Sequence, residues 1–274
     1  MKKNKNISGV TLVEILIGVV ISVVMMAAMF TSYNVVNNTY SKVTDTAKMS
    51  QAGRETLGMI MRDVRMAGYK YFGDNIPYDP VQHIPIKITK QSNTNPCDKL
   101  EIVYGDLEAD DQTPPNFTFK RYRVTYFCAE DTRNDPEKNN STYYQTQNLK
   151  FIKKKKEVWI PGNPGKFSVT TSSKTYDEET IVQYVQDLIF DPVDNEGKLI
   201  DPPPSDTDNQ DKVNAIKIVE VLLSVRSKNT FYRAKKVREK KALNDEGRNP
   251  GKGLEDRYLR ETILISAHAR NLGL

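Results

Sequence analysis

The feature that most constrains this chain is an apolar run near its start. Residues 10–30 contain one charged residue, Glu14, and three lysines precede the run. About 20 apolar residues, at about 1.5 Å each in a helix, span a hydrocarbon core of about 30 Å. A carboxylate in such a span costs about 2.5 to 3.5 kcal/mol at the bilayer centre and less near an interface. The run therefore predicts a membrane helix, and Glu14 predicts a role beyond anchoring.

Two ordinary kinds of N-terminal segment explain this run less well. A secretory signal places its small-residue cleavage site after the apolar stretch, whereas Gly9 lies before it. Cleavage after Gly9 would remove the lysines and leave the apolar helix on the mature chain. An ordinary membrane anchor has a suitable length, but it gives no reason for Glu14.

The string SGVTLVEILIG at residues 8–18 resembles the leader junction of type IV pilins and type II secretion pseudopilins. The resemblance implies that residues 1–9 are a leader, that prepilin peptidase cuts after Gly9, and that Val10 becomes a methylated N-terminus. It also implies that Glu14 is the assembly carboxylate, which neutralises the N-terminal amine of a neighbouring subunit. An amine in an apolar phase is tolerated only when it is paired, and Glu14 is the one opposite charge in the run.

The lysines before the run predict the orientation of the chain. By the positive-inside rule, Lys2, Lys3 and Lys5 stay in the cytoplasm, so the chain after about residue 31 is extracytoplasmic. We therefore expect a single-pass protein of the cytoplasmic (inner) membrane with an extracytoplasmic C-terminal head. The resemblance adds the pilus as its location after assembly.

The helical pattern continues beyond the membrane run. A stripe with alternate steps of four and three residues, seven of its nine positions apolar, consists of Val36, Tyr40, Val43, Ala47, Ser50, Arg54, Leu57, Met61 and Val64. No proline occurs before Pro77, so Val10 to about Ala67 is predicted to be one helix, ended near Gly68. Major pilins commonly have a proline at the position that Thr31 occupies here. Because this chain lacks that proline, a kink at this point is not assumed.

The predicted organisation has four parts. Residues 1–9 are the cleaved leader, residues 10–30 the transmembrane and filament-core half of the helix, and residues 31–68 its amphipathic half. Residues 69–274 form an extracytoplasmic β-rich head, with candidate strands at 100–104, 117–126, 157–160, 166–171, 181–190, 214–226 and 258–269. A helix followed by strands, without βαβ alternation, predicts an α+β fold in which the helix packs on antiparallel strands. The resemblance implies the same pilin-like architecture.

The two cysteines, Cys97 and Cys128, fall in the predicted extracytoplasmic part. An oxidising environment permits a disulfide between them. Two independent reduced thiols are an alternative, and metal ligation is another, although two cysteines alone make a weak metal site.

Three charged segments each have a solvated and a functional interpretation. Residues 191–211 carry seven acids against one lysine, and Asp191, Asp194 and Asn195 are weak calcium candidates because they precede Gly197 without the EF-hand spacing. Otherwise that segment is a solvated linker. Residues 228–257 carry ten basic residues against five acids, with Phe231 and Tyr232 among them, which suits either a solvated surface or DNA contact. The same two interpretations apply to the run 153–156, and charge runs are usually solvated faces.

Net charge gives little support to nucleic acid binding. The formal charge is +5, and without the three leader lysines the mature chain is near +2 (5 − 3).

Catalytic motifs are also missing from the sequence. His83 and His268 are the two histidines and neither belongs to an HExxH string, and there is no G-x-S-x-G or GxxxxGK[ST] string. We therefore expect no enzymatic activity and no cofactor.

Three further strings narrow the resemblance to PilW-type minor pilins, which are related to pseudopilin J of type II secretion. They are MRDVRMAGY at 61–69 and the stretches at 213–228 and 257–274. The resemblance implies a minor pilin that primes assembly of a type IV pilus within a tip complex. Its partners would be prepilin peptidase, other minor pilins, the major pilin and the inner-membrane assembly platform. A type II secretion pseudopilin is the alternative, and a pilus component that contacts DNA or a surface is a third interpretation.

Overall fold

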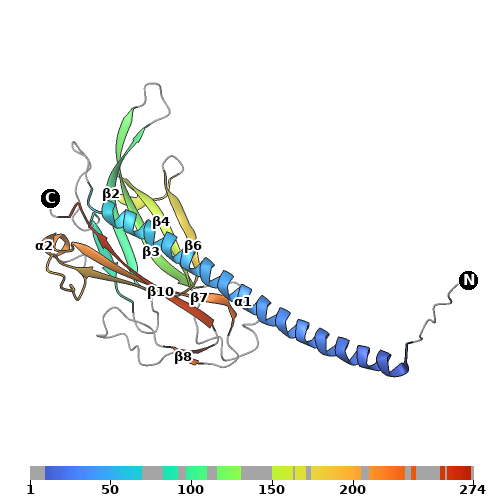
Figure 1. The fold of residues 1–274 in the computed structure, drawn as a ribbon. Helices are drawn as coiled ribbons and strands as arrows, with labels where there is room; N and C mark the ends of the chain where they lie inside the picture. The colour runs from blue at the N-terminus through green and yellow to red at the C-terminus, as the bar shows by residue number, and fades with distance from the viewer. Residues whose placement is uncertain are drawn as a thin grey trace, which may run out of the picture. The chain divides into compact units, whose positions relative to one another are not determined.

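The fold is one long helix followed by an antiparallel β-sheet, seen in a computed structural model (Figure 1). The structure describes residues 10–69, 83–91, 97–109, 116–130, 150–162, 164–170, 174–204, 210–231, 236–238, 254–256 and 258–272. The chain divides into two compact units, Met1–Ala47 and Lys48–Leu274. The helix belongs to both units, and each unit is described by itself below.

Helix α1 runs without interruption from Leu12 to Met66, close to the predicted limits. At about 1.5 Å per residue its 55 residues measure about 82 Å. Gly68, with a φ of 74°, follows it in the left-handed conformation that commonly ends helices. In the first unit the apolar side chains of the helix are exposed. The most apolar stretch of the helix has a mean hydropathy of 2.6. By length and composition, this segment is suited to crossing a membrane.

The amphipathic stripe is only partly as predicted. Leu57 and Val64 are buried, whereas Arg54 is exposed, and in the first unit Tyr40 and Val43 are exposed. The buried face of α1 in the head unit consists of Gly53, Thr56, Leu57, Ile60, Asp63 and Val64. This face includes a glycine, a threonine and an aspartate. A pattern of apolar residues at helical spacing therefore does not predict which side of the helix is buried.

The main sheet has the strand order β1-β2-β3-β4-β6-β7-β10, and β5 pairs with β4. All the pairings are antiparallel, as predicted. The strands are β1 (Ile86–Thr89), β2 (Lys99–Ala109), β3 (Phe117–Glu130), β4 (Lys150–Ile160), β5 (Lys166–Ser168), β6 (Tyr176–Val193), β7 (Ile218–Thr230) and β10 (Tyr258–His268). A second, two-stranded sheet joins β8 (Lys236–Arg238) to β9 (Leu254–Asp256), and a short helix, α2 (Gln210–Asn214), precedes β7.

Four of the differences from the predicted strands have a clear physical reason. Strand β4 starts at Lys150 instead of residue 157, because its lysines conceal the alternation of its two faces. Strand β6 extends to Val193, so the start of the predicted acidic linker is a buried strand end. The predicted strand 214–226 starts too early, because Asn214 is the last residue of helix α2 and strand β7 begins at Ile218. Strand β1 was not predicted at all, since four residues give too short a pattern.

The core lies between one face of the main sheet and the part of α1 that belongs to the head unit (Figure 1). Leu57, Ile60 and Val64 from the helix are buried in one cluster with alternate residues of the strands. Strand residues of this inner face include Leu100, Ile102, Val124, Tyr126, Ile152, Leu188, Val221 and Leu223. The other face of β2, β3 and β4 is therefore the outer face of the sheet.

Cys97 and Cys128 form a disulfide, with Cα atoms 6.0 Å apart. The bridge joins Cys97, which lies just before strand β2, to Cys128 in strand β3. The two cysteines are 31 residues apart in the sequence. The predicted pairing is thus confirmed, and neither the reduced nor the metal-bound alternative applies.

Candidate functional site

The start of α1 holds the residues that the leader resemblance singled out. The backbone N–H of Thr11 donates to Glu14 Oε2 at 2.8 Å, and the Thr11 hydroxyl donates to the same oxygen at 2.9 Å. In return, the N–H of Glu14 donates to Thr11 Oγ1 at 3.3 Å. This reciprocal pattern is a capping box, which satisfies two N–H groups that a helix start leaves unpaired. Thr11 therefore holds the Glu14 carboxylate at the first turn.

Glu14 keeps the capacity to bind a cation while it caps its own helix. Both hydrogen bonds from Thr11 reach Oε2, and an ionised carboxylate offers about four acceptor positions. Within the described part of the chain, no basic side chain forms an ion pair with Glu14. Val10, which would carry a new amine after cleavage, is 72% exposed. Gly9 lies outside the described residues, so the cleavage, the methylation and the assembly role stay predictions.

A second carboxylate of α1, Asp63, belongs to a buried polar network in the head. Lys154 Nζ lies 2.8 Å from Asp63 Oδ2, and the Tyr126 hydroxyl donates to the same oxygen at 2.6 Å. All three residues are buried. Burial and the adjacent negative charge of Asp63 raise the pKa of Tyr126 far above its usual value, so the phenol stays a donor. The network attaches the helix to β3 and β4 by charge as well as by apolar packing.

The lysine run of β4 divides between the two faces of the sheet. Lys154 points inward to Asp63, and Lys156 lies over the ring of Tyr122, with Nζ 4.1 Å from the centroid. Burial lowers the pKa of Lys156. On the outer face, Lys153 pairs with Glu178 at 2.7 Å and Lys155 with Asp177 at 3.2 Å. The expectation that this run is a solvated face is therefore wrong for half of it, because strand alternation turns every second lysine inward.

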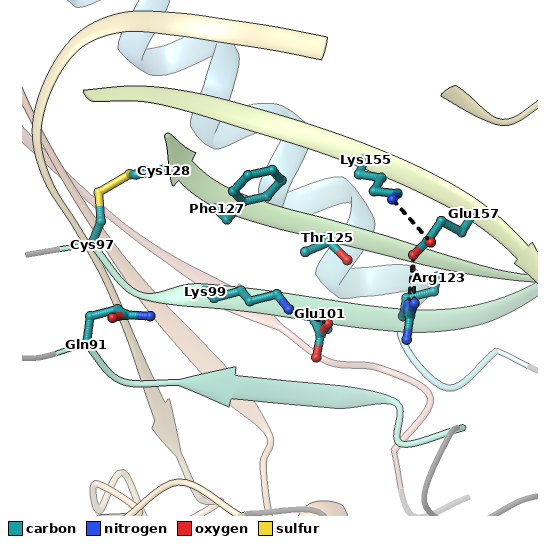
Figure 2. Close-up of a pocket in the computed structure, with 10 residues that line it drawn as sticks. All are labelled: Gln91, Cys97, Lys99, Glu101, Arg123, Thr125, Phe127, Cys128, Lys155 and Glu157. Atoms are coloured by element: carbon teal, nitrogen blue, oxygen red, sulfur yellow. Dashed lines mark hydrogen bonds and ion pairs between the residues drawn. A yellow bond between two sulfur atoms is a disulfide. The ribbon is translucent and has the colours of Figure 1, made fainter. Parts of the chain in front are cut away.

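A groove of about 410 Å³ lies on the outer face of β2, β3 and β4 (Figure 2). The disulfide is part of its wall. The lining residues are Gln91, Cys97, Lys99, Glu101, Arg123, Thr125, Phe127, Cys128, Lys155 and Glu157. Since five of these ten are charged, the groove is a polar site rather than an apolar pocket for a small molecule.

Each carboxylate of the groove is held by two cations. Glu101 pairs with Lys99 at 2.8 Å and with Lys87 at 3.9 Å. Glu157 accepts hydrogen bonds from Arg123 Nε at 3.0 Å and Nη2 at 2.8 Å, and Lys155 Nζ lies 3.4 Å away (Figure 2). Burial alone would lower the pKa of Lys155, but Asp177 and Glu157 outweigh that effect and raise it. Lys155 is therefore charged at any physiological pH.

The calcium candidates are not brought together as a ligand set. Asp191, in β6, forms an ion pair with Lys90. Asp194 Oδ1 accepts the N–H groups of Glu196 at 2.9 Å and Lys198 at 2.8 Å, which closes a turn. Asn195 is exposed in that turn. In the described ranges, no group of three or more histidine, cysteine or acidic residues is arranged to hold a metal ion.

The two histidines have different environments. His83 is buried, accepts a hydrogen bond at Nδ1 from Arg121 Nη1 at 2.8 Å, and meets the Trp159 ring edge-on with centroids 4.5 Å apart. Sequence reasoning missed this cluster, because no motif links residues so far apart. His268 ends β10 as an exposed residue. Most of the basic segment 228–257 lies outside the described residues, so its suggested DNA contact stays untested.

Comparison with known proteins adds one structural likeness. No family model matches the chain, and no curated protein matches it either. Among solved structures, a type IV-like pilin from Thermus thermophilus is similar, with 9% sequence identity and a TM-score of 0.45. The likeness covers 82% of this chain and 96% of that one. These values are too low to assign a function.

Proposed function

We propose that this chain is a minor pilin of the PilW type, which is incorporated into a type IV pilus and helps to prime its assembly. The observation that carries the proposal is Glu14, a lone carboxylate in the apolar start of a continuous helix of 55 residues. A glycine precedes it at the spacing of a pilin leader junction, and an antiparallel sheet follows the helix. The role is structural, with no catalytic step.

In the proposed mechanism, prepilin peptidase cuts after Gly9 and methylates Val10. The apolar first half of α1 then leaves the bilayer and packs among the helices of other subunits. Glu14 would neutralise the amine of a neighbouring subunit, since a charged amine transferred from water needs a partner. The extracytoplasmic head would contact other minor pilins in a tip complex, and burial of about 800 Å² per partner would be ordinary for such contacts.

Deletion of the gene, with surface pili and protein secretion scored in the same strain, tests this proposal. We expect loss of pili with normal secretion, and complementation by the wild-type chain should restore the pili. Loss of secretion with normal pili would replace the proposal with the type II pseudopilin alternative. If both phenotypes stayed normal, neither assembly role would stand.

A further inference from the structure

The groove on the outer face of the sheet presents mainly positive charge to solvent. The side chains of Lys99, Arg123 and Lys155 are 40%, 31% and 30% exposed, whereas those of Glu101 and Glu157 are 13% and 9% exposed. The carboxylates therefore form the floor of the groove, and the cations stand around them. A ligand that enters the groove meets ammonium and guanidinium groups before it meets a carboxylate.

The charges of the groove do not cancel. Its lining has three cations against two carboxylates, and the neighbours Lys87 and Asp177 add one charge of each sign. A lysine ammonium has three N–H donors, so Lys99 and Lys155 can donate to an incoming acceptor while they keep their present carboxylate. One positive charge in excess, carried by exposed groups, complements a ligand with a moderate negative charge.

We propose that this groove binds an acidic, extended segment of a partner protein. The carboxylates of the segment would pair with Lys99 and Lys155, its backbone would lie along the strands, and an apolar side chain would contact the half-buried ring of Phe127. Gln91 supplies an amide that can bond to a peptide group. The chemistry of the groove itself carries this inference, which is independent of the proposed pilin function.

A nucleic acid suits the groove less well than an acidic protein segment. A phosphate backbone carries one charge per nucleotide along its whole length. The carboxylates of Glu101 and Glu157 would repel such a dense row of negative charge from the floor of the groove. A peptide that carries acidic and apolar side chains at every second residue matches both the cations and Phe127, since residues i, i+2 and i+4 of an extended chain point to the same side.

Fluorescence anisotropy on the full-length protein in detergent tests the proposal. The probe is a labelled hexapeptide whose first, third and fifth residues are glutamate, valine and glutamate and whose other residues are serine. It is compared with the same peptide carrying glutamine in place of glutamate, and with ten-nucleotide single-stranded DNA. We expect the acidic peptide to bind, and its affinity to fall as salt is added. The double variant Lys99→Glu, Lys155→Glu should lower that affinity by about tenfold or more. Lys99→Gln, Lys155→Gln should cause a smaller loss.

The matched control is Lys198→Glu, Lys228→Glu, which changes the net charge by the same amount at exposed lysines outside the lining of the groove. It should leave the affinity nearly unchanged. Equal affinity of the groove variants and the control would overturn the proposal, as would equal binding of the two peptides or binding of the DNA alone. Thermal unfolding of each variant shows whether it is folded. If the glutamate double variant does not fold, the loss of affinity is measured with the glutamine double variant instead.

Discussion

Two carboxylates of one helix, Glu14 and Asp63, have opposite relations to their surroundings. Asp63 is buried in the head unit, where Lys154 and Tyr126 of the same chain satisfy it. Glu14 is exposed in the apolar first unit, where its contacts are the local capping bonds with Thr11. A buried charge that is paired internally serves the fold. The charge of Glu14, which pairs with no cation of the chain within the described residues, is the basis of the proposed pairing with another subunit.

The largest expected effect comes from Glu14→Ala. The variant should still be processed after Gly9, because the cleavage site is intact, but it should fail to enter pili, because the amine of a neighbouring subunit would have no counter-charge. Immunoblots of membrane and sheared pilus fractions measure both steps. Thr11→Val is the matched control: it removes the hydroxyl of the cap but keeps the carboxylate, so incorporation should be largely retained. Normal incorporation of Glu14→Ala would contradict the assembly role.

Asp63→Ala tests the other side of the comparison. It leaves Lys154 buried without its carboxylate, and breaking a buried pair costs about 3 to 5 kcal/mol. Chemical denaturation should show this loss in the free energy of unfolding. Arg62→Ala, next to it on the exposed side of the helix, should change stability by less than about 0.5 kcal/mol.

The double variant Asp63→Leu, Lys154→Met sharpens the same result. Because it replaces the pair with apolar groups of similar volume, it should recover most of the stability lost in Asp63→Ala. If the double variant were no more stable than Asp63→Ala, the buried pair would not explain the loss.

Much of the fold could be predicted from the sequence, and the reasons are local. Gly68 predicts the helix end because the left-handed conformation at that position favours glycine. The strands β2 and β3 show alternating apolar residues, which mark one buried face each. The sequence also singles out Glu14, because its charge conflicts with the apolar residues around it, and its assembly role is a prediction that the experiments above test.

The interior charge network could not be predicted, since its partners are far apart in the chain. Asp63 and Lys154 are separated in the sequence by a helix end and three strands. Nothing in the sequence around either residue distinguishes it from a solvated one. The acid at Asp191 likewise belongs to a pair with Lys90 and not to a loop. The outer groove depends on strand order, which places Arg123 beside Glu157.

Removal of the disulfide should have an effect of similar or slightly smaller size than Asp63→Ala. Closing a loop of this length stabilises a fold by about 3.5 to 4 kcal/mol in the chain-entropy model. We expect Cys97→Ala, Cys128→Ala to lower the free energy of unfolding by about that amount. The unfolding curves of the oxidised and reduced wild-type protein should differ in the same way, and coincident curves would show that the bridge does not stabilise the head.

The smallest effect is expected for Lys153→Met, which tests the two faces of β4. Lys153 pairs with Glu178 near the surface, with side chains 25% and 46% exposed. Such pairs contribute about 0 to 1 kcal/mol, so the variant should be nearly as stable as the wild type. Lys154→Met, one residue away, should destabilise the head clearly more, because it leaves Asp63 buried without its cation. Equal losses in the two variants would contradict the division of the lysine run between the faces.

Mass spectrometry of the N-terminal peptide from the native membrane protein tests the central claim most directly. We predict a peptide that begins at Val10, with one added methyl group on its amine and the apolar segment retained. A peptide that still contains Lys2, Lys3 and Lys5, or a mature chain that begins after residue 30, would contradict the proposed processing and the assembly role that depends on it.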